Sequence, residues 1–210
     1  MKRLILCRHG ESEYNAKRII QGHIDTDLTP AGVVQARLAG EELKKFNIQR
    51  VFSSDLKRAF RTAQIIADVL DMDITKDKRI REMSFGEWEG RTYDHIFETD
   101  YQTFQNWLKN PVACPLPYQE DIENFRSRLE SFIKDILKLP EDNILIVAHG
   151  GSIQGIICIM TGLGLENLWA LKHTNTGISV LETDGRKTEI KLLNYSKHLE
   201  TEKRTETVIL

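Results

Sequence analysis

Short, continuous apolar runs alternate along this chain with longer stretches in which apolar residues recur every three or four positions. The continuous runs cover residues 4–7, 50–54 and 143–148, and a weaker run covers 72–76. Runs of this length, bounded by glycine or polar residues, are typical of buried strands in a parallel sheet. The pattern therefore predicts four such strands.

The periodic stretches predict amphipathic helices. One begins after Thr29, which can cap it, has Pro30 in its first turn and ends near Asn47. A second follows residues 50–54, and we expect Asp55 to cap it. Further helices are expected within residues 92–137, the most aromatic part of the chain, and after His149.

This alternation predicts an α/β fold: a doubly wound, mostly parallel sheet with helices on both faces. Residues 177–183 and 188–193 flank Asp184-Gly185, which predicts a hairpin and an antiparallel edge strand. We expect one domain over residues 1–196, with a helical insertion at about 91–140 that lies over the ligand crevice as a lid. The charged residues 197–210 are expected to form a poorly ordered tail.

Composition and charge narrow the class of protein. The net charge is −2 and the charged residues are mixed along the chain, which gives no support to a nucleic-acid surface or a polybasic membrane patch. No apolar run reaches membrane-spanning length. The three cysteines form no CxxC pair, which suits a reducing compartment. We expect a cytoplasmic protein that binds neither nucleic acid nor membrane, and its exposed edge strand could pair two copies as a homodimer.

Polar residues that could take part in binding or catalysis follow the predicted strands. Arg8 and His9 end the first strand, and His149 with Gly150 ends the fourth. Arg58 lies in the first turn of the second helix, where a cation opposes the helix dipole unless an anion binds there. The carboxyl ends of parallel strands meet at one edge, where open α/β sheets bind ligands. We therefore expect these side chains to share one site.

The residue types in this set point to an anion. A guanidinium suits phosphate oxygens, a histidine can be a covalent nucleophile, and glycines at a helix start leave N–H groups for an anion. The sequence contains no Walker loop and no compact metal motif. The pattern predicts metal-free phosphoryl transfer to a histidine. Residues 79–90 add three glutamates, and periodicity does not choose among Glu82, Glu87 and Glu89.

These motifs resemble those of the histidine phosphatase superfamily, in the branch that includes cofactor-dependent phosphoglycerate mutase. The resemblance runs from Leu4 to about Leu181. The shared residues are Arg8-His9-Gly10-Glu11-Ser12 with Asn15, Gln21-Gly22, Ser53-Ser54-Asp55-Leu56 with Arg58-Ala59 and Thr62-Ala63, Arg81-Glu82 with residues 85–90, and Ala148-His149-Gly150-Gly151.

The resemblance implies roles for individual residues. It implies that His9 is the phosphorylated nucleophile and that Glu82 is the acid and base. It implies that the phosphoryl group and substrate are held by Arg8, Asn15, Gln21, Gly22, Arg58, Glu82, His149 and Gly150. It implies no metal and no cofactor. We also expect a backbone carbonyl to fix the tautomer of His9.

The resemblance favours a phosphomonoesterase for a small phosphorylated metabolite, closest to the α-ribazole-phosphate, phosphoserine and broad-specificity phosphatases. The short segment between Glu82 and His149 and the residues 87–90 support this choice over the alternative, a mutase that needs 2,3-bisphosphoglycerate. A non-catalytic relative is a third alternative, against which the complete residue set argues. Phe85 replaces the histidine of some phosphoserine phosphatases, and residues 118–120 replace a common Gly-Gly-Glu, so the leaving group stays open. Asn175 is a weaker candidate for the site.

Overall fold

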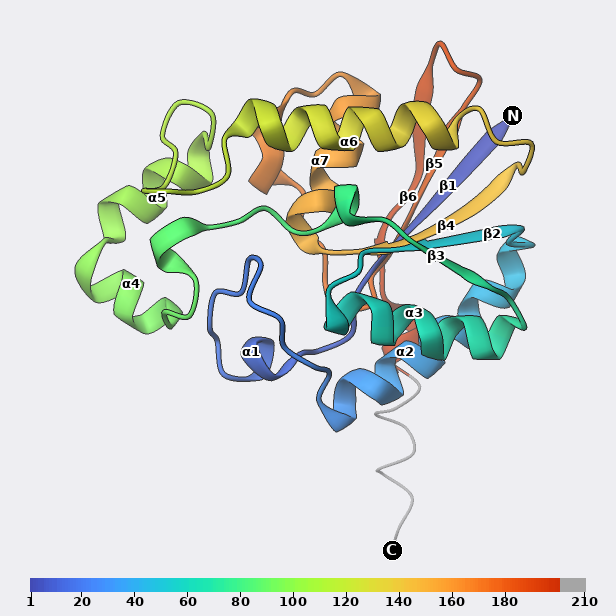
Figure 1. Cartoon of the computed structure of the whole chain (residues 1–210), viewed down its shortest axis with the longest axis horizontal. Helices are drawn as coiled ribbons and strands as arrows, with labels where there is room; N and C mark the ends of the chain where they lie inside the picture. Colours follow the sequence, from blue (N-terminus) through green and yellow to red (C-terminus); the bar gives the residue numbers. More distant parts are fainter. Residues whose placement is uncertain (201–210) are drawn as a thin grey trace, which may run out of the picture.

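The computed structural model describes residues 1–200, and a six-stranded sheet in the order β3-β2-β4-β1-β5-β6 forms its centre (Figure 1). The strands are β1 (Lys2–Arg8), β2 (Arg50–Ser53), β3 (Ile74–Lys76), β4 (Asn143–Ala148), β5 (Ile178–Thr183) and β6 (Thr188–Tyr195). Strands β1 to β4 are parallel, β5 runs antiparallel beside β1, and β6 runs antiparallel beside β5. The predicted mostly parallel sheet with an antiparallel edge is confirmed, and the antiparallel part comprises both strands of the hairpin.

Helices cover both faces of this sheet, as the alternation of elements predicts. The α-helices are α1 (Glu13–Ala16), α2 (Pro30–Leu43), α3 (Lys57–Leu70), α4 (Tyr93–Thr99), α5 (Tyr101–Lys109), α6 (Ile122–Ile136) and α7 (Gly150–Thr161). Short 3₁₀ helices lie at Lys44–Phe46, Lys78–Ile80, Gly86–Trp88, Leu165–Ala170 and Lys197–Leu199. Helices α2 and α3 lie on one face of the sheet, and α6 and α7 lie on the other (Figure 1).

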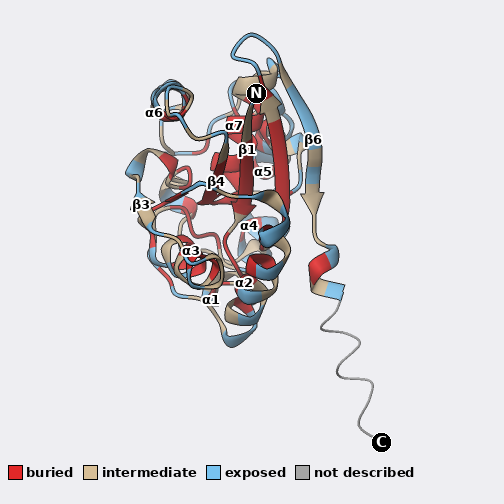
Figure 2. Cartoon of the chain, turned by 90° about the vertical axis from the view of Figure 1, so that its right-hand side faces the viewer, coloured by how far each residue is buried: buried red, intermediate tan, exposed pale blue. Residues whose placement is uncertain are grey.

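The side chains of β1 show why this strand is apolar throughout. Leu4 and Leu6 pack with α6 and α7, whereas Ile5 and Cys7 pack with α2 and α3. Successive side chains of a strand point to opposite faces, so a strand covered on both faces needs apolar residues at every position. Figure 2 shows the result: β1 and β4 are buried, and β6 is largely accessible at the outer edge.

One predicted helix cap is wrong. The residue that precedes the first turn of α3 is Leu56, and the Asp55 carboxylate instead accepts two hydrogen bonds from the Arg81 guanidinium, at 2.7 and 2.6 Å. The bidentate pair joins two charged groups through two hydrogen bonds, whereas a cap would join the carboxylate to neutral backbone N–H groups. The Arg81 pair therefore draws Asp55 away from the helix and holds the segment before Glu82 against the start of α3.

The helical insertion divides into two parts. Helix α6 packs on the sheet beside α7, and it belongs to the main core. Helices α4 and α5 lie together at one end of the molecule (Figure 1), where they form a separate aromatic cluster with Trp88. Of the two parts, only α4 and α5 lie beside the carboxyl edge of the sheet, so the lid predicted over residues 91–140 corresponds to these two helices.

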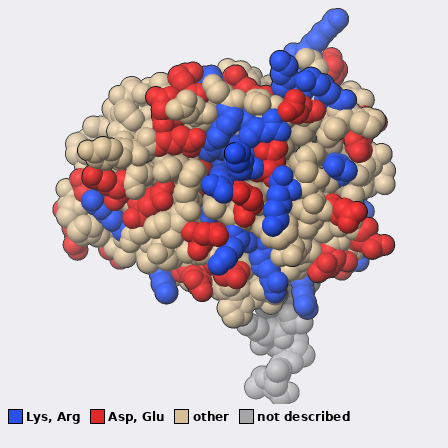
Figure 3. All heavy atoms as spheres, in the orientation of Figure 1, with Lys and Arg blue, Asp and Glu red and all other residues tan. Residues whose placement is uncertain are grey.

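The chain remains packed beyond the domain boundary predicted at residue 196, because His198 in the last 3₁₀ helix is buried. The rest of the predicted tail, residues 201–210, lies outside the described residues. On the face shown in Figure 3, basic and acidic side chains are interspersed, in keeping with the mixed charge of the sequence. Within residues 1–200, no helix combines the length and apolar character needed to cross a membrane.

Candidate active site

A cavity of about 210 Å³ lies at the carboxyl edge of the parallel strands, with α4 and α5 on its far side. Its walls include every predicted site residue except His149, namely Arg8, His9, Asn15, Gln21, Gly22, Arg58, Glu82 and Gly150. His149 is fully buried directly behind His9. The structure thus brings the whole predicted set together, as expected for strands whose carboxyl ends share one edge.

The pairing of β1 with β4 places the two histidines side by side. Arg8 is opposite Ala148 in the ladder, and the His9 N–H donates to the Ala148 carbonyl at 2.9 Å. The next residue of β4's chain is His149, whose ring centroid lies 5.2 Å from that of His9. Residues 140 positions apart therefore become neighbours through the register of one strand pair.

His9 is held in one orientation. Its Nδ1 lies 2.7 Å from the Gly10 carbonyl oxygen, which accepts only an N–H, so Nδ1 carries the proton and Nε2 keeps its lone pair. The predicted role of a backbone carbonyl is confirmed. Burial, reinforced by the charges of Arg58 and Arg8, lowers the pKa of His9 well below its usual value. The imidazole is therefore neutral at neutral pH and can act as a nucleophile.

His149 is also neutral. Burial lowers its pKa well below the usual value, and the nearby Arg58 acts in the same direction. Its Nε2 lies 2.8 Å from the Ser54 hydroxyl, and within residues 1–200 its buried Nδ1 has no hydrogen-bond partner. When the Ser54 hydroxyl donates to Nε2, the ring proton sits on Nδ1 and is available to an added acceptor. This geometry favours a neutral imidazole that donates from Nδ1 over a protonated one.

Arg58 reaches the cavity from the first turn of α3. Its guanidinium donates to the carbonyls of Gly22 at 2.7 Å and Ile24 at 2.9 Å, which fixes the loop before α2. Burial lowers the pKa of Arg58 to about 10, so the side chain stays charged at neutral pH. Gly22 itself has a φ of +51°, a conformation that glycine adopts without strain, and a Cβ there would collide with Glu89.

The segment at residues 173–176 forms hydrogen bonds with the residues at the end of β1. The Arg8 guanidinium donates to the His173 carbonyl, and the Thr176 N–H donates to the carbonyls of Arg8 and His9. The Asn175 amide donates to the His9 carbonyl and to the side-chain oxygen of Asn15, both at 3.1 Å. Asn175, only a weak candidate from sequence, thus lies directly beside the site.

The Glu82 carboxylate lies at the N-terminus of α7. Its carboxylate accepts N–H groups from Gly151 at 3.0 Å, Ser152 at 3.1 Å and Met83 at 2.9 Å. The sequence predicted that N–H groups at this helix start would meet an anion, and in the structure Gly151 and Ser152 meet the Glu82 carboxylate. Of the other two glutamates in this loop, Glu87 is exposed and Glu89 accepts from the backbone of His23 and Phe85. Glu82 is the one that lines the cavity.

Several cavity residues were not predicted. Trp107 and Trp169 form an aromatic wall with Phe85, the residue that the sequence linked to the leaving group, and Gln154 lines the cavity from α7. Residues 118–120, linked to the leaving group with Phe85, do not line the cavity. Gln154 follows Gly150 by four residues on a helix that is otherwise largely apolar, so its polarity was a usable signal. Trp169 lies in a stretch without a periodic pattern, where the sequence carried no such signal. Across residues 1–200, no group of three or more His, Cys, Asp or Glu side chains could hold a metal ion.

The comparison with protein families identifies the superfamily of this chain. The sequence model described as "Histidine phosphatase superfamily (branch 1)" matches residues 4–196. The chain belongs to this superfamily, and it is a phosphatase.

Individual relatives agree with this assignment. The chain is 47% identical over 198 residues to a protein of Hydrogenobacter thermophilus named putative phosphoserine phosphatase 2, covering 94% of this chain and 98% of that protein. It is 36% identical over 180 residues to a probable phosphoglycerate mutase of Serratia proteamaculans, covering 85% of this chain and 84% of that one. Among solved structures, a mycobacterial glucosyl-3-phosphoglycerate phosphatase in complex with VO3 superimposes with a TM-score of 0.86 at 26% identity, covering 93% of this chain and all of that one.

Proposed function

We propose that this phosphatase hydrolyses a small phosphomonoester without a metal or cofactor, through a phosphohistidine formed on His9. One observation carries the proposal: a neutral imidazole with its lone pair on Nε2 lies in one cavity with two arginines. A neutral imidazole is a competent nucleophile, and guanidinium groups stabilise the charge that spreads over the phosphoryl oxygens.

Unused donors support an anion at this place. Within residues 1–200, Arg8 Nε, Arg58 Nε and His149 Nδ1 are buried and have no acceptor. A buried N–H without a partner costs about 1–3 kcal/mol, so native structures rarely leave several together unless a ligand completes them. The equatorial oxygens of a phosphoryl group would accept from these donors.

In the first step, His9 Nε2 attacks phosphorus and the bond from phosphorus to the ester oxygen breaks. Protonated Glu82 gives its proton to the leaving oxygen, so an alcohol departs and the carboxylate remains. In the second step, a water attacks the phosphohistidine, Glu82 takes the proton of that water, and the P–N bond breaks to release phosphate. Together, the two steps return His9 and Glu82 to their starting states.

The nucleophile is tested with the variant His9→Ala, which we expect to lower kcat by at least about a thousandfold. Acid-sensitive, alkali-stable labelling with a ³²P-phosphomonoester should appear on the unmodified protein and be absent from this variant. His95→Ala is the matched control, because His95 is an exposed residue on α4. Undiminished turnover or labelling in His9→Ala would refute the assignment. All assays contain a chelator, and loss of activity in it would contradict the metal-free reaction.

A mutase is the second candidate function, favoured by the relative that is named a probable phosphoglycerate mutase. A mutase returns the phosphoryl group to a second hydroxyl of the retained intermediate, and water is excluded from the phosphohistidine. The test supplies 3-phosphoglycerate with and without 2,3-bisphosphoglycerate and follows both isomerisation and phosphate release. Phosphate release without isomerisation supports the hydrolase, and efficient isomerisation stimulated by the bisphosphate overturns it.

A further inference from the structure

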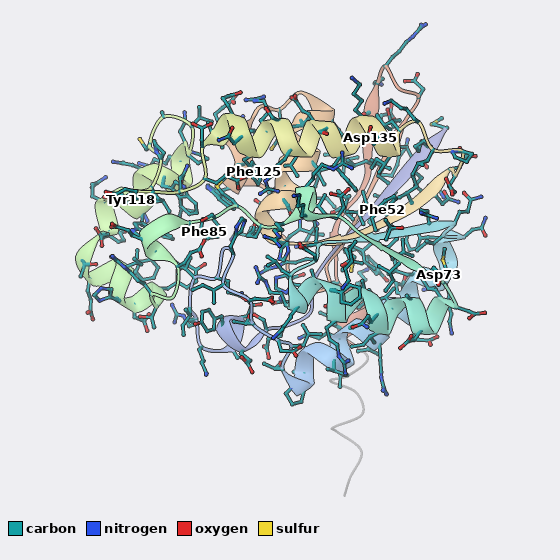
Figure 4. All side chains as sticks on the ribbon, viewed as in Figure 1. Phe52, Asp73, Phe85, Tyr118, Phe125 and Asp135 are labelled. Carbon is teal, nitrogen blue, oxygen red and sulfur yellow. The ribbon has the colours of Figure 1, made fainter. Side chains whose placement is uncertain are left out.

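The cavity has two chemically different halves. The half at the sheet edge holds His9, Arg8 and Arg58, where the phosphoryl group is proposed to bind. The other half is built by α4, α5 and the 3₁₀ helices at Gly86–Trp88 and Leu165–Ala170. Phe85 lies on that side of the molecule (Figure 4). The substrate atoms beyond the ester oxygen must occupy this second half, because His9 attacks from the opposite side of phosphorus.

The position of Glu82 shows where the leaving group sits. An acid that protonates the leaving oxygen must lie within hydrogen-bond reach of that oxygen. A Cβ built on Gly151 would collide with Glu82 Oε1 and would lie 3.2 Å from Trp169 Cη2, so the carboxylate and the indole flank the same glycine. A group that leaves beside Glu82 therefore departs against Trp169.

Trp169 belongs to a continuous aromatic wall. Its ring centroid lies 4.6 Å from that of Trp107 and 6.1 Å from that of Phe85, and Phe85 and Trp107 are 5.6 Å apart. Three mutually packed rings form a rigid apolar surface that favours aromatic or aliphatic groups over charged ones.

Charge in the cavity points to the same conclusion. In the part of the chain that the structure describes, Arg8 and Arg58 are the only Lys or Arg residues that line the cavity, and both lie at the phosphoryl end. A carboxylate or a second phosphate on the substrate would find no cation of its own at the aromatic wall, where it would also lose its hydration.

Two cavity-lining polar atoms without a partner within residues 1–200 are neutral. One lies at the aromatic wall, and the other belongs to Gln154, which lies next to Arg8: a Cβ on Gly150 would be 3.7 Å from Gln154 Nε2 and 3.8 Å from Arg8 Cζ. Gln154 Oε1 and Trp169 Nε1 are buried and, within residues 1–200, have no hydrogen-bond partner. Gln154 is only 6% exposed and lines the cavity. One neutral acceptor and one neutral donor suit a hydroxyl, ether or amide of the substrate, and neither compensates an ionic group.

We propose that the site selects phosphomonoesters whose organic part is uncharged and presents an aromatic or other apolar face to Trp107 and Trp169. This inference rests on the proposed function, since it assigns the leaving-group side of the same cavity. It separates this chain from a phosphatase built for phosphoserine, whose organic part carries both an ammonium and a carboxylate group.

The test compares benzyl phosphate with phosphoserine, in chelator, by steady-state phosphate release. Both esters expel an alkoxide that Glu82 must protonate, so the comparison reports binding of the organic part more than leaving-group reactivity. We expect kcat/KM to be at least about tenfold higher for benzyl phosphate. Equal or higher kcat/KM for phosphoserine would overturn the inference and leave the phosphohistidine reaction intact. Absence of phosphate release from both esters and from an aryl phosphate would instead refute the proposed function.

Two variants locate the preference. Trp107→Leu and Trp169→Leu should each lower kcat/KM for benzyl phosphate about tenfold and change that for phosphoserine less than about twofold. Tyr101→Leu is the matched control, because Tyr101 is an exposed aromatic residue of α5 outside the cavity. Equal losses for both substrates, or no loss for either, would contradict an aromatic leaving-group wall. Far-UV and near-UV circular dichroism checks the fold, and the substrate ratio of the unmodified protein remains a test if a variant does not fold.

Discussion

At the scale of single residues, burial makes the two histidines different from surface histidines. His9 and His149 lie against two arginines, so a proton on either ring would be both desolvated and repelled. Both rings therefore stay neutral, and each is oriented by one oxygen: the Gly10 carbonyl for His9 and the Ser54 hydroxyl for His149. The hydrogen bonds of these rings decide which nitrogen of His9 keeps its lone pair and which nitrogen of His149 carries the proton.

The Ser54 hydroxyl gives a direct test of this arrangement. Ser54→Ala removes the donor to His149 Nε2, so the ring loses the contact that places its proton on Nδ1. We expect kcat to fall about tenfold with little change in KM, because His149 would act on charge that develops in the transition state. Ser53→Ala is the control, since the Ser53 hydroxyl is also buried but donates to the Ser54 carbonyl. Equal kcat values for the two variants would contradict a role for Ser54 in orienting His149.

The sequence reached part of this residue-scale picture. Arg8, His9 and His149 follow buried strands, and parallel strands bring their ends together, so their proximity was predictable from pattern. Glu82 was chosen among three glutamates only through the family resemblance. The contacts of Ser54 with His149 and of Asn175 with His9 depend on side-chain directions across 95 and 166 positions, which periodicity does not specify.

At the scale of elements, α6 is tied to the loop that carries Glu82. The Arg128 guanidinium forms an ion pair with Glu120 at 2.6 Å and donates to the backbone carbonyls of Arg79, Arg81 and Glu82. One side chain of α6 thereby holds three backbone carbonyls within residues 79–82, the segment that ends at the proposed acid. The sequence predicted the helix from its apolar face, but the role of a polar residue on that helix depends on the loop that folds against it.

Removal of this connection should be costly. Arg128→Met removes the cation beside Glu120 and the donor to the carbonyls of Arg79 and Arg81, whereas the Glu82 carbonyl keeps its contact with His23 Nε2. We expect the free energy of unfolding to fall by about 3 kcal/mol. Urea titration measures this loss, and Lys134→Met, an exposed position of the same helix, should change it by less than about 0.5 kcal/mol. A variant of Arg128 as stable as that control would show that the network adds nothing.

At the scale of the whole molecule, buried neutral histidines make stability depend on pH. Burial lowers the pKa of His173 to about 4, and its Nε2 is bonded to the Ser179 hydroxyl. As the pH falls below the unfolded value of about 6.5, the unfolded chain takes up a proton that the folded protein refuses, so the folded state loses stability until the pH reaches about 4. His9 and His149 add to this loss in the same direction.

The contribution of His173 can be isolated. From pH 7.5 to 5 its lowered pKa accounts for about 2 kcal/mol of lost stability, so His173→Gln should reduce the pH dependence of unfolding by about that amount. Urea titrations at both pH values measure the difference, with the exposed His95→Gln as control. An unchanged pH dependence in His173→Gln would mean that this histidine is not held neutral by the fold.

The separation between the ladder that pairs β1 with β4 and the aromatic cluster around Trp88 has an evolutionary consequence. Insertion of one residue into either strand would shift the two imidazoles out of alignment and turn every following side chain to the opposite face, so the ladder tolerates substitutions better than insertions. Helices α4 and α5 pack on each other, on Trp88 and on the 3₁₀ helix at Leu165–Ala170 rather than on the strands, so their lengths can change while the sheet stays the same. A lineage built on this architecture can acquire new substrates by remodelling one detachable end and still inherit its reaction unchanged.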